Sequence, residues 1–359
     1  MAENISKSLK IREKICMVTT SFLDYDTRIL KEAETLAKYY DLTILTKKYD
    51  RPIILKKSNF KIKRIKYFKF GIFLLNILSS FFSLTLAAFK ENPDIYHAHD
   101  LDGLLCAYLP SLIKRRKLIY DSHELWSGLP NFSNLKGVRW LIPLLEKLLM
   151  TKVYQGITVN ESIAEILEKK YNKPFLPIYN FSNIPKGKKQ FSLKKKYPNQ
   201  KIILHLGKTS ELRGQAQIDL ATKFLPDHFK TVFIKDIPPD DIVATINEAD
   251  IGLALTQKSS LSYYYSLPNK LFQYIAAEVP VLGSNFPEIK KVILENQIGE
   301  VVDPSNPKLI AQKILEMMKS ENQKKYRRNL KGLARKKYNW DEESKKLLLF
   351  YEDLIGNGK

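Results

Sequence analysis

Cysteine is scarce in this chain of 359 residues, which contains only Cys16 and Cys106. Two cysteines are too few for a disulfide framework, and because both lie in apolar runs the simplest expectation is a pair of buried, reduced thiols. The sequence therefore favours a compartment that keeps thiols reduced. We expect the protein to be cytoplasmic.

The first residues also lack the pattern of a secretory signal. Residues 1–14 are polar and charged, and the apolar run at 15–18 is too short for the core of a signal peptide. This segment does not indicate secretion, in agreement with the expected cytoplasmic location.

Motifs for metal and nucleic-acid binding are missing too. His97 and His99 come nearest to a metal-ligand spacing but have no partners in the sequence. The formal charge of +21 indicates an anionic partner. However, the basic residues are spread over linker, loops and helices, with no known recognition module and no stripe interleaved with aromatics. We expect no metal, no other cofactor and no nucleic acid; a phosphate-rich substrate or a membrane surface remains.

Short apolar runs alternate with stretches long enough for helices, which predicts parallel, doubly wound sheets. In the first half the predicted strands are 14–19, 42–46, 95–98, 118–120 and 156–159. A segment with prolines and many lysines follows at 180–200, and the alternation then begins again. The predicted strands of the second half are 201–206, 231–234, 251–255 and 280–283. The length suits two α/β domains.

These patterns predict four parts of the chain. Residues 1–182 form a first Rossmann-like domain, 183–200 a basic linker and 201–339 a second Rossmann-like domain. Residues 340–359 contain a helix, because apolar residues recur at 347, 348, 351, 354 and 355. Such a helix has one face to bury.

Ligands collect at the carboxyl ends of the strands in a doubly wound sheet. Three predicted strands of the first half are followed there by charged or imidazole side chains: Asp26 and Arg28; His99 and Asp100; Asp121 and His123. His97 alternates with His99, so we expect it to pack inside the domain.

The second half carries a candidate anion site. Ser266, Leu267, Pro268, Asn269 and Lys270 read as a helix start, with serine as the cap and proline in the first turn. The free N–H groups and the dipole of such a start suit a diphosphate. Lys208 and Arg213, which follow the strand at 201–206, bring two more cations to the same edge. Plain capping explains the serine and proline equally well without a ligand.

Several segments together resemble glycosyltransferase family 4, a large retaining family with the GT-B fold of two Rossmann-like domains around a cleft. In the first half these are DYDTRILKEAETLA, NPDIYHAHDLDGLLCAYL, LIYDSHELW and ITVNESIAEIL. In the second half they are LGKTSELRG, INEADIGLALTQ, YYYSLPNKLFQYIAAEVPVLGSNFPEIKKVI and IGEVVDPSNP. The resemblance extends over nearly the whole chain.

This resemblance implies a role for each domain and for several residues. The second domain would bind the nucleotide-sugar and the first would face the acceptor, while the last helix crosses back onto the first domain. Lys208 and Arg213 look like the basic pair at the donor diphosphate, and the helix start at 266–270 like the phosphate site. His123 looks like the family histidine beside the donor sugar, and Asp26, Arg28, His99, Asp100 and Asp121 are candidates on the acceptor side.

One departure from the family pattern concerns two glutamates separated by seven residues. The matching positions here are Tyr265 and Gln273. An amide can still bond a ribose hydroxyl, though more weakly than a carboxylate does. We therefore expect a donor site that includes Gln273, with UDP-sugar favoured and GDP-sugar next. The alternative is an inactive family member that binds an active transferase.

The longest uncharged stretch, 71–89, reads GIFLLNILSSFFSLTLAAF and follows a basic run at 61–69. Its length allows a membrane span, but both flanks belong to the same predicted sheet. We expect a helix in the membrane interface on the inner face of the cytoplasmic membrane, with its lysines on anionic headgroups. That position favours a lipid-linked saccharide as acceptor, in cell-surface polysaccharide or glycolipid synthesis. The alternative is a helix covered by its own domain.

Overall fold

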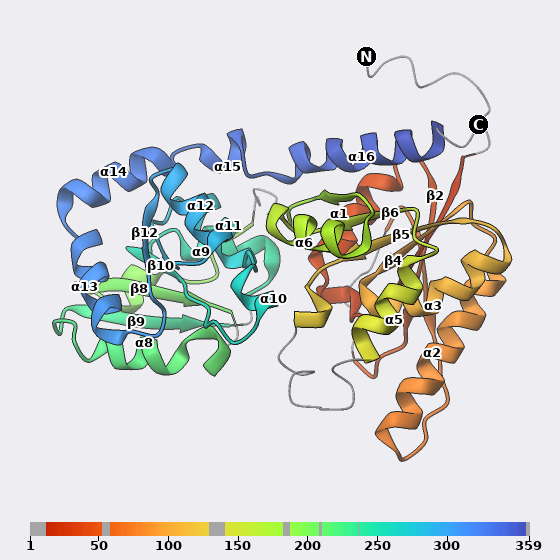
Figure 1. Ribbon diagram of the computed structural model, residues 1–359. Helices are drawn as coiled ribbons and strands as arrows, with labels where there is room; N and C mark the ends of the chain where they lie inside the picture. Colours follow the sequence, from red (N-terminus) through yellow and green to blue (C-terminus); the bar gives the residue numbers. More distant parts are fainter. Residues whose placement is uncertain are drawn as a thin grey trace.

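The computed structural model describes residues 12–51, 58–128, 141–181, 187–207, 210–235 and 237–356. In these parts of the chain, two sheets of seven and five strands each form the centre of a layered α/β unit. Figure 1 shows the two units side by side, with the last helix lying along the first of them. The fold is GT-B.

The first sheet has the order β3-β2-β1-β4-β5-β6-β7, and every neighbouring pair is parallel. Its central strands consist mostly of buried residues, as expected of a sheet covered on both faces. The bounds are β1 Lys14–Thr19, β2 Asp41–Lys47, β3 Lys61–Ile65, β4 Ile95–His99, β5 Lys117–Ser122, β6 Gln155–Thr158 and β7 Phe175–Pro177.

Two helical layers cover this sheet. One cluster of buried side chains joins it to α2 Phe73–Lys90, α3 Asp100–Ile113, α5 Leu141–Met150 and α6 Glu161–Tyr171. The opposite cluster joins it to α1 Thr27–Leu36 and to the final helix α16 Trp340–Gly356. The alternation of strand residues between the two clusters explains why the strands read as continuous apolar runs.

The second sheet, also parallel, has the order β12-β11-β10-β8-β9. Its order reverses between β8 and β10, and such a reversal opens a crevice at the carboxyl ends of the strands. The bounds are β8 Lys201–Leu206, β9 Phe229–Ile234, β10 Ile251–Ala254, β11 Val281–Ser284 and β12 Gly299–Val302.

Helices also lie on both faces of the second sheet. One buried cluster contains residues of α9 Ile242–Ile246, α11 Asn269–Ala276, α12 Pro287–Glu295 and α15 Leu333–Lys336. The other contains residues of α8 Gln215–Thr222, α13 Pro307–Met317 and α14 Ser320–Leu330. Two further short helices are α7 Leu193–Lys196 and α10 Leu261–Tyr264.

The segment after the first sheet packs onto the second unit. Phe181 and Leu193 are buried in the core of that unit, and the N–H of Lys188 donates to Asp241 Oδ1 at 2.8 Å. From residue 187 on, the lysine-rich stretch expected as a linker therefore belongs to the surface of the second domain. Its lysine content hid the buried Leu193 and the partly buried Tyr197, which anchor it to the core.

The last helix packs on the first domain through Leu347, Tyr351 and Leu354, which are fully buried with residues of α1. His97 is fully buried as predicted, and its Nδ1 lies 2.8 Å from the hydroxyl of Tyr351. This contact joins a strand of the first domain to the end of the chain.

Three strands were missed by the sequence patterns. β3 is an edge strand with the sequence KIKRI, and its basic residues had favoured headgroup contact rather than a strand. β7 has only three residues. β12 is four residues long, with Glu300 and Val301 only half-buried. Strands this short carry little periodicity.

Candidate active site

A cavity of about 640 Å³ lies between the two domains. The first domain contributes Asp26, Arg28, His123 and Glu124 to its lining. The second contributes Gly207, Arg213, Gln273 and the whole stretch of Ser266, Leu267, Pro268, Asn269 and Lys270. Residues predicted from separate strand ends and from a helix start thus line opposite walls of the same cavity.

His123 is held between two carboxylates at the cavity wall. Its Nε2 lies 3.3 Å from Asp121 Oδ2, and its Nδ1 lies 3.4 Å from Asp100 Oδ2. The backbone N–H of His123 also donates to Asp100 Oδ1 at 3.0 Å. Asp100 itself has a positive φ of 59°, a conformation that costs energy in most residues but is tolerated by aspartate. This backbone geometry fixes the imidazole orientation.

The two carboxylates keep His123 protonated. Burial lowers its pKa, but the charges of Asp100 and Asp121 outweigh burial and raise the pKa to about 10. At neutral pH the ring is therefore an imidazolium with a donor on each nitrogen. A hydrogen-bond donor with a full positive charge is thus placed at the cavity, with 15% of the side chain exposed.

Behind His123 lies a buried ion-pair network. Arg28 Nη2 donates to Asp121 Oδ1 at 2.8 Å and its Nε lies 3.1 Å from Glu32 Oε1, all three side chains being almost fully buried. Burial raises the pKa of Asp121, but Arg28 and His123 hold it well below its usual range. Burial and the neighbouring Asp121 raise the pKa of Glu32 to about 8. The network thus keeps the Asp121 carboxylate ionised and in contact with His123.

Among the acceptor-side candidates, only Asp26 and Arg28 line the cavity. Asp26 caps α1 by accepting from the N–H of Ile29 at 3.2 Å. Arg28 is 3% exposed, with its guanidinium turned to Asp121 and to the carbonyl of Ile178. His99 and Asp121 are fully buried, so they support His123 and do not face a ligand. This placement corrects the expectation of acceptor contact for both.

Glu32, His97, His99 and Asp121 present ligand atoms within 4.8 Å of one another, a spacing that could hold a metal ion. The Arg28 guanidinium already contacts both carboxylates. A cation would have to displace that buried positive charge or bear its repulsion. The donor set therefore fits an arginine-centred network better than a metal site.

The second-domain wall is built around the start of α11. The structure places the N-cap at Pro268, which makes no side-chain bond to the first turn. Ser266 was predicted as the cap, but its hydroxyl donates to the carbonyl of Tyr263 at 2.8 Å. The first-turn N–H groups are therefore left without a serine cap beside the cavity, which is the arrangement that binds anions at helix starts.

Two predicted cations behave differently from one another. Arg213 is half-buried at the cavity, beside Gly207, whose φ of +90° suits only glycine. Lys270 is turned inward, with its Nζ 3.0 Å from His205 Nε2, and burial together with Arg213 lowers its pKa to about 7. Lys208 lies outside the described residues. Of the predicted donor-side cations that the structure describes, Arg213 is thus better placed for an anionic ligand than Lys270.

The two positions that depart from the glutamate pattern have different surroundings. Gln273 lines the cavity one turn into α11. Tyr265 packs against the core of the first domain, and its carbonyl accepts from Asn160 Nδ2 at 2.8 Å. Tyr265 therefore serves the contact between the domains.

Sequence reasoning did not select Glu124, although it belongs to the strand-end run of His123, and missed Lys235 among the lining residues. Both follow strands directly or nearly so, since β5 ends at Ser122 and β9 at Ile234. The strand-end rule that selected His123 was sufficient to find them. Tyr25, which is 65% exposed at the cavity, carried no such signal.

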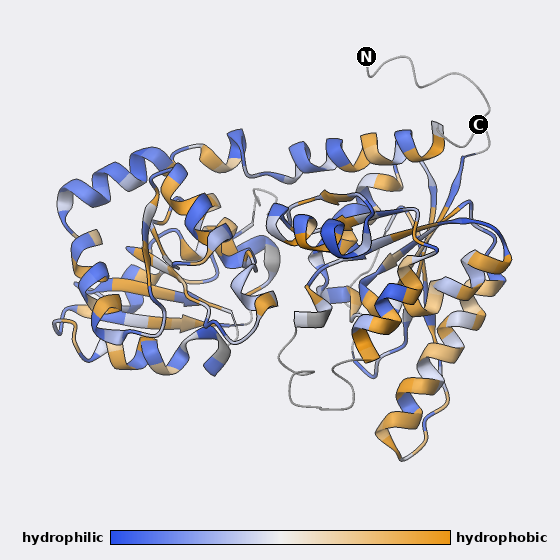
Figure 2. Ribbon diagram, viewed as in Figure 1, coloured by the Kyte–Doolittle hydropathy of each residue, from blue (hydrophilic) through white to orange (hydrophobic). Residues whose placement is uncertain are grey.

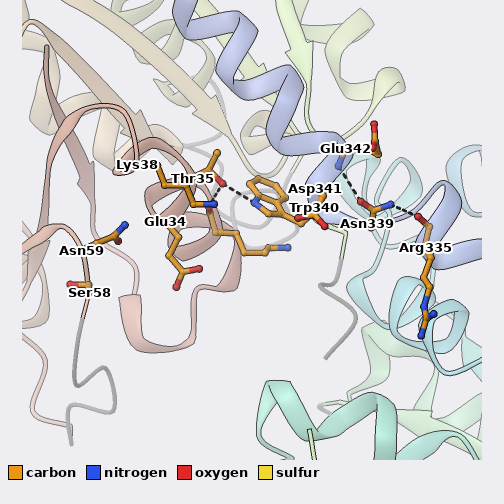
Figure 3. A pocket seen from close by; sticks show the side chains of 11 residues that line it. Glu34, Thr35, Lys38, Ser58, Asn59, Arg335, Asn339, Trp340, Asp341 and Glu342 are labelled. Atoms are coloured by element: carbon orange, nitrogen blue, oxygen red, sulfur yellow. Dashed lines mark hydrogen bonds between the residues drawn. The ribbon is translucent and has the colours of Figure 1, made fainter. Parts of the chain in front are cut away.

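A second cavity, of about 800 Å³, lies where α16 begins (Figure 3). Trp340 Nε1 donates to Thr35 Oγ1 at 2.9 Å there, and Lys31 Nζ lies 4.9 Å from the Trp340 ring. Lys31 also donates to the carbonyl of Phe181. These contacts join the two places where the chain passes between the domains. Among the described residues, no strand end lines this cavity, whereas His123, Gly207 and Lys235 beside strand ends line the smaller one. The smaller cavity is therefore the candidate active site.

Two family models match the chain. "Glycosyltransferase Family 4" matches residues 27–183 and "Glycosyl transferases group 1" matches residues 218–337. Together they cover most of the sequence, one model for each domain. The chain belongs to glycosyltransferase family 4 and is a retaining glycosyltransferase of the hexosyltransferase type that uses a nucleotide-sugar donor. A comparison with curated protein sequences gave no match.

Solved structures agree on the fold. HepE from Anabaena in complex with UDP-glucose has a TM-score of 0.74 at 12% identity, covering 95% of this chain and 100% of that one. Sucrose-phosphate synthase from Thermosynechococcus elongatus has a TM-score of 0.73 at 13% identity, with 96% and 100% covered. A glycosyltransferase from Rickettsia africae has a TM-score of 0.70 at 14% identity, with 97% and 100% covered.

Proposed function

We propose that the protein moves a hexose from a UDP-sugar to a hydroxyl of a saccharide. The observation that carries this proposal is the shared cavity, in which Arg213 and the α11 start face His123 from the opposite domain. One wall suits a diphosphate, and the other supplies a charged donor where the sugar would lie.

The two walls of the cavity have different roles in the reaction. Breaking the bond between the anomeric carbon and the phosphate oxygen leaves negative charge on the diphosphate. Arg213 and the helix dipole stabilise that charge as it develops. His123, held as an imidazolium by Asp100 and Asp121, donates a hydrogen bond to the sugar or its leaving oxygen. Both contributions strengthen in the transition state.

UDP is our first choice of nucleotide and GDP the second. Support comes from the similar fold of HepE, whose structure is described as a complex with UDP-glucose. Gln273 is the side chain of this chain that would meet the ribose, in place of the glutamate of the family pattern.

For the acceptor we propose a lipid-linked saccharide, used in cell-surface polysaccharide or glycolipid synthesis at the inner face of the cytoplasmic membrane. Phe22 and Tyr25 line the first-domain side of the cavity, with ring centroids 5.4 Å apart, and offer faces on which a sugar ring can stack. The exposed apolar helix α2 on the same domain supports a lipid environment.

Thermal-shift screening with UDP-, GDP- and ADP-glucose tests the donor assignment. Ligand that binds the folded state raises the apparent stability, so we expect the largest upward shift with UDP-glucose and a reduced shift in Arg213→Ala. A shift without any sugar transfer or donor hydrolysis would support the inactive family member. The absence of a shift with all three donors would refute the proposed site.

A further inference from the structure

The first domain carries a broad apolar surface on one of its helical layers. Figure 2 shows hydrophobic residues along α2, α3 and α5, which cover the same face of the sheet. The exposed members, here called the apolar face, are Ile72, Phe73, Leu74, Leu75, Leu78, Phe82 and Leu86 with Leu109, Leu112, Ile113, Leu141, Leu144 and Leu148. Soluble monomers rarely expose a large contiguous apolar patch without a use for it.

Helix α2 contributes most of this surface. Only Ser80, Leu84 and Ala88 are buried, and they form one narrow stripe at helical spacing. Phe73 is 79% exposed and Phe82 66% exposed. The helix is long and apolar enough to cross a membrane, yet only 17% of it is buried in the described structure. The alternative of a helix covered by its own domain is therefore wrong.

Cations border the apolar face. Every charged residue from 51 to 90 is a lysine or an arginine. Lys66 and Lys69 precede α2 and Lys90 ends it, all three exposed. The acidic groups nearest in sequence are already paired: Asp50 with Lys69, Glu91 with Lys63 and Asp94 with Arg116. The surface is thus apolar in the middle and basic at its edge.

We propose that the apolar face docks on the surface of an anionic lipid bilayer. Apolar side chains would enter the boundary between headgroups and acyl chains, while the bordering lysines contact anionic headgroups. A second copy of the chain fits less well, because a symmetric contact would bring the two basic borders together. The proposal concerns this surface alone and does not depend on the transfer chemistry.

The topology decides between lying on the bilayer and spanning it. β3 and β4, which lie on either side of α2 in the chain, belong to one sheet, where β2 and β1 lie between them. A span by α2 would place these strands on opposite sides of the membrane. A helix of 18 residues is about 27 Å long, so α2 can lie in the interface over its whole length.

Vesicle flotation with the full-length protein and no donor tests the docking. The probes are vesicles of neutral phosphatidylcholine alone and of phosphatidylcholine with phosphatidylglycerol. We expect binding to the anionic vesicles at low salt, weakened by high salt and weak on neutral vesicles. Failure to bind anionic vesicles at low salt would overturn the proposal.

Two sets of variants separate the apolar and basic parts. Phe73→Ser, Leu78→Ser and Phe82→Ser together change exposed side chains only and should lower vesicle affinity more than tenfold. Phe81 is avoided because it packs against the core. Lys66→Ala with Lys90→Ala should lower affinity roughly thirtyfold at low salt, since each lysine near an anionic surface contributes about fivefold.

Matched changes in the second domain are the controls. Phe224→Ser replaces a phenylalanine that is 51% exposed, and Lys324→Ala with Lys325→Ala removes two exposed cations. We expect wild-type binding from both, and an unchanged circular dichroism spectrum from every variant. Equal losses in the controls would contradict docking by the apolar face. So would resistance to carbonate extraction, or a dimer in solution that the triple variant converts to monomer.

Discussion

The two walls of the active-site cavity are built in opposite ways. On the first-domain side, Arg28, Asp121 and His123 form a chain of charged contacts that is almost entirely buried. On the second-domain side, the hydrogen-bond donors of the Arg213 side chain and of the first turn of α11 lie beside the cavity. The charges of the first wall pair with one another and fix the orientation of the His123 imidazolium. The positive charge of the second wall faces the cavity, where a ligand would bind. Substitutions should therefore harm stability on one side and donor binding on the other.

The largest expected effect comes from Asp121→Asn. The change leaves Arg28 as a buried guanidinium without its main counter-charge, and breaking such a pair costs about 3–5 kcal/mol. The temperature of thermal unfolding should fall by about 6 °C or more. Asp26→Asn is the control at the cavity, since asparagine also caps helices and should change the temperature little. Equal melting of both variants would mean that the network adds no stability.

His123→Ala should come next, through turnover. Loss of a charged donor placed at the reacting sugar is expected to lower kcat by about 10²–10³ while leaving donor binding nearly unchanged. Steady-state kinetics with separate calorimetry of donor binding would measure both. A loss of donor affinity as large as the loss of turnover would assign His123 to binding.

The pH dependence of kcat sharpens the role of the carboxylates. Because the pKa of His123 is raised to about 10, the imidazolium is complete at neutral pH and is lost as the pH rises through about 10. Activity that needs the cation should fall there. Asp100→Asn removes one of the two charges that raise the pKa of His123, so the fall in activity should shift to lower pH. An unchanged profile in this variant would contradict the assignment of the titration to His123.

The smallest expected effect is that of Gln273→Glu. A carboxylate accepts a ribose hydroxyl bond more strongly than an amide does, so donor binding should tighten by a few-fold or stay unchanged. Gln273→Ala should weaken binding and serves as the comparison. Weaker binding in Gln273→Glu would exclude the ribose contact.

Much of this arrangement could be predicted from the sequence. The alternation of strands and helices located the strand ends, and the same rule placed His123 at the edge of the first sheet and Arg213 at the edge of the second. It could not show that Arg28 and Asp121 would pair, because they are 93 positions apart and both lie at strand-end positions typical of ligand contacts. The bond between His97 and Tyr351 spans 254 positions and depends on where α16 docks. Ser266 failed as a cap because the helix begins later than its local pattern indicates.

The most direct test of the two-wall account is the donor dissociation constant, measured by calorimetry with UDP-glucose for wild type, Arg213→Ala and His123→Ala. Removing a charge-assisted contact typically costs about 1.5–3 kcal/mol, so Arg213→Ala should raise the constant by roughly 10- to 100-fold. His123→Ala should leave it within about twofold. A constant raised equally in both variants, or in neither, would contradict the account.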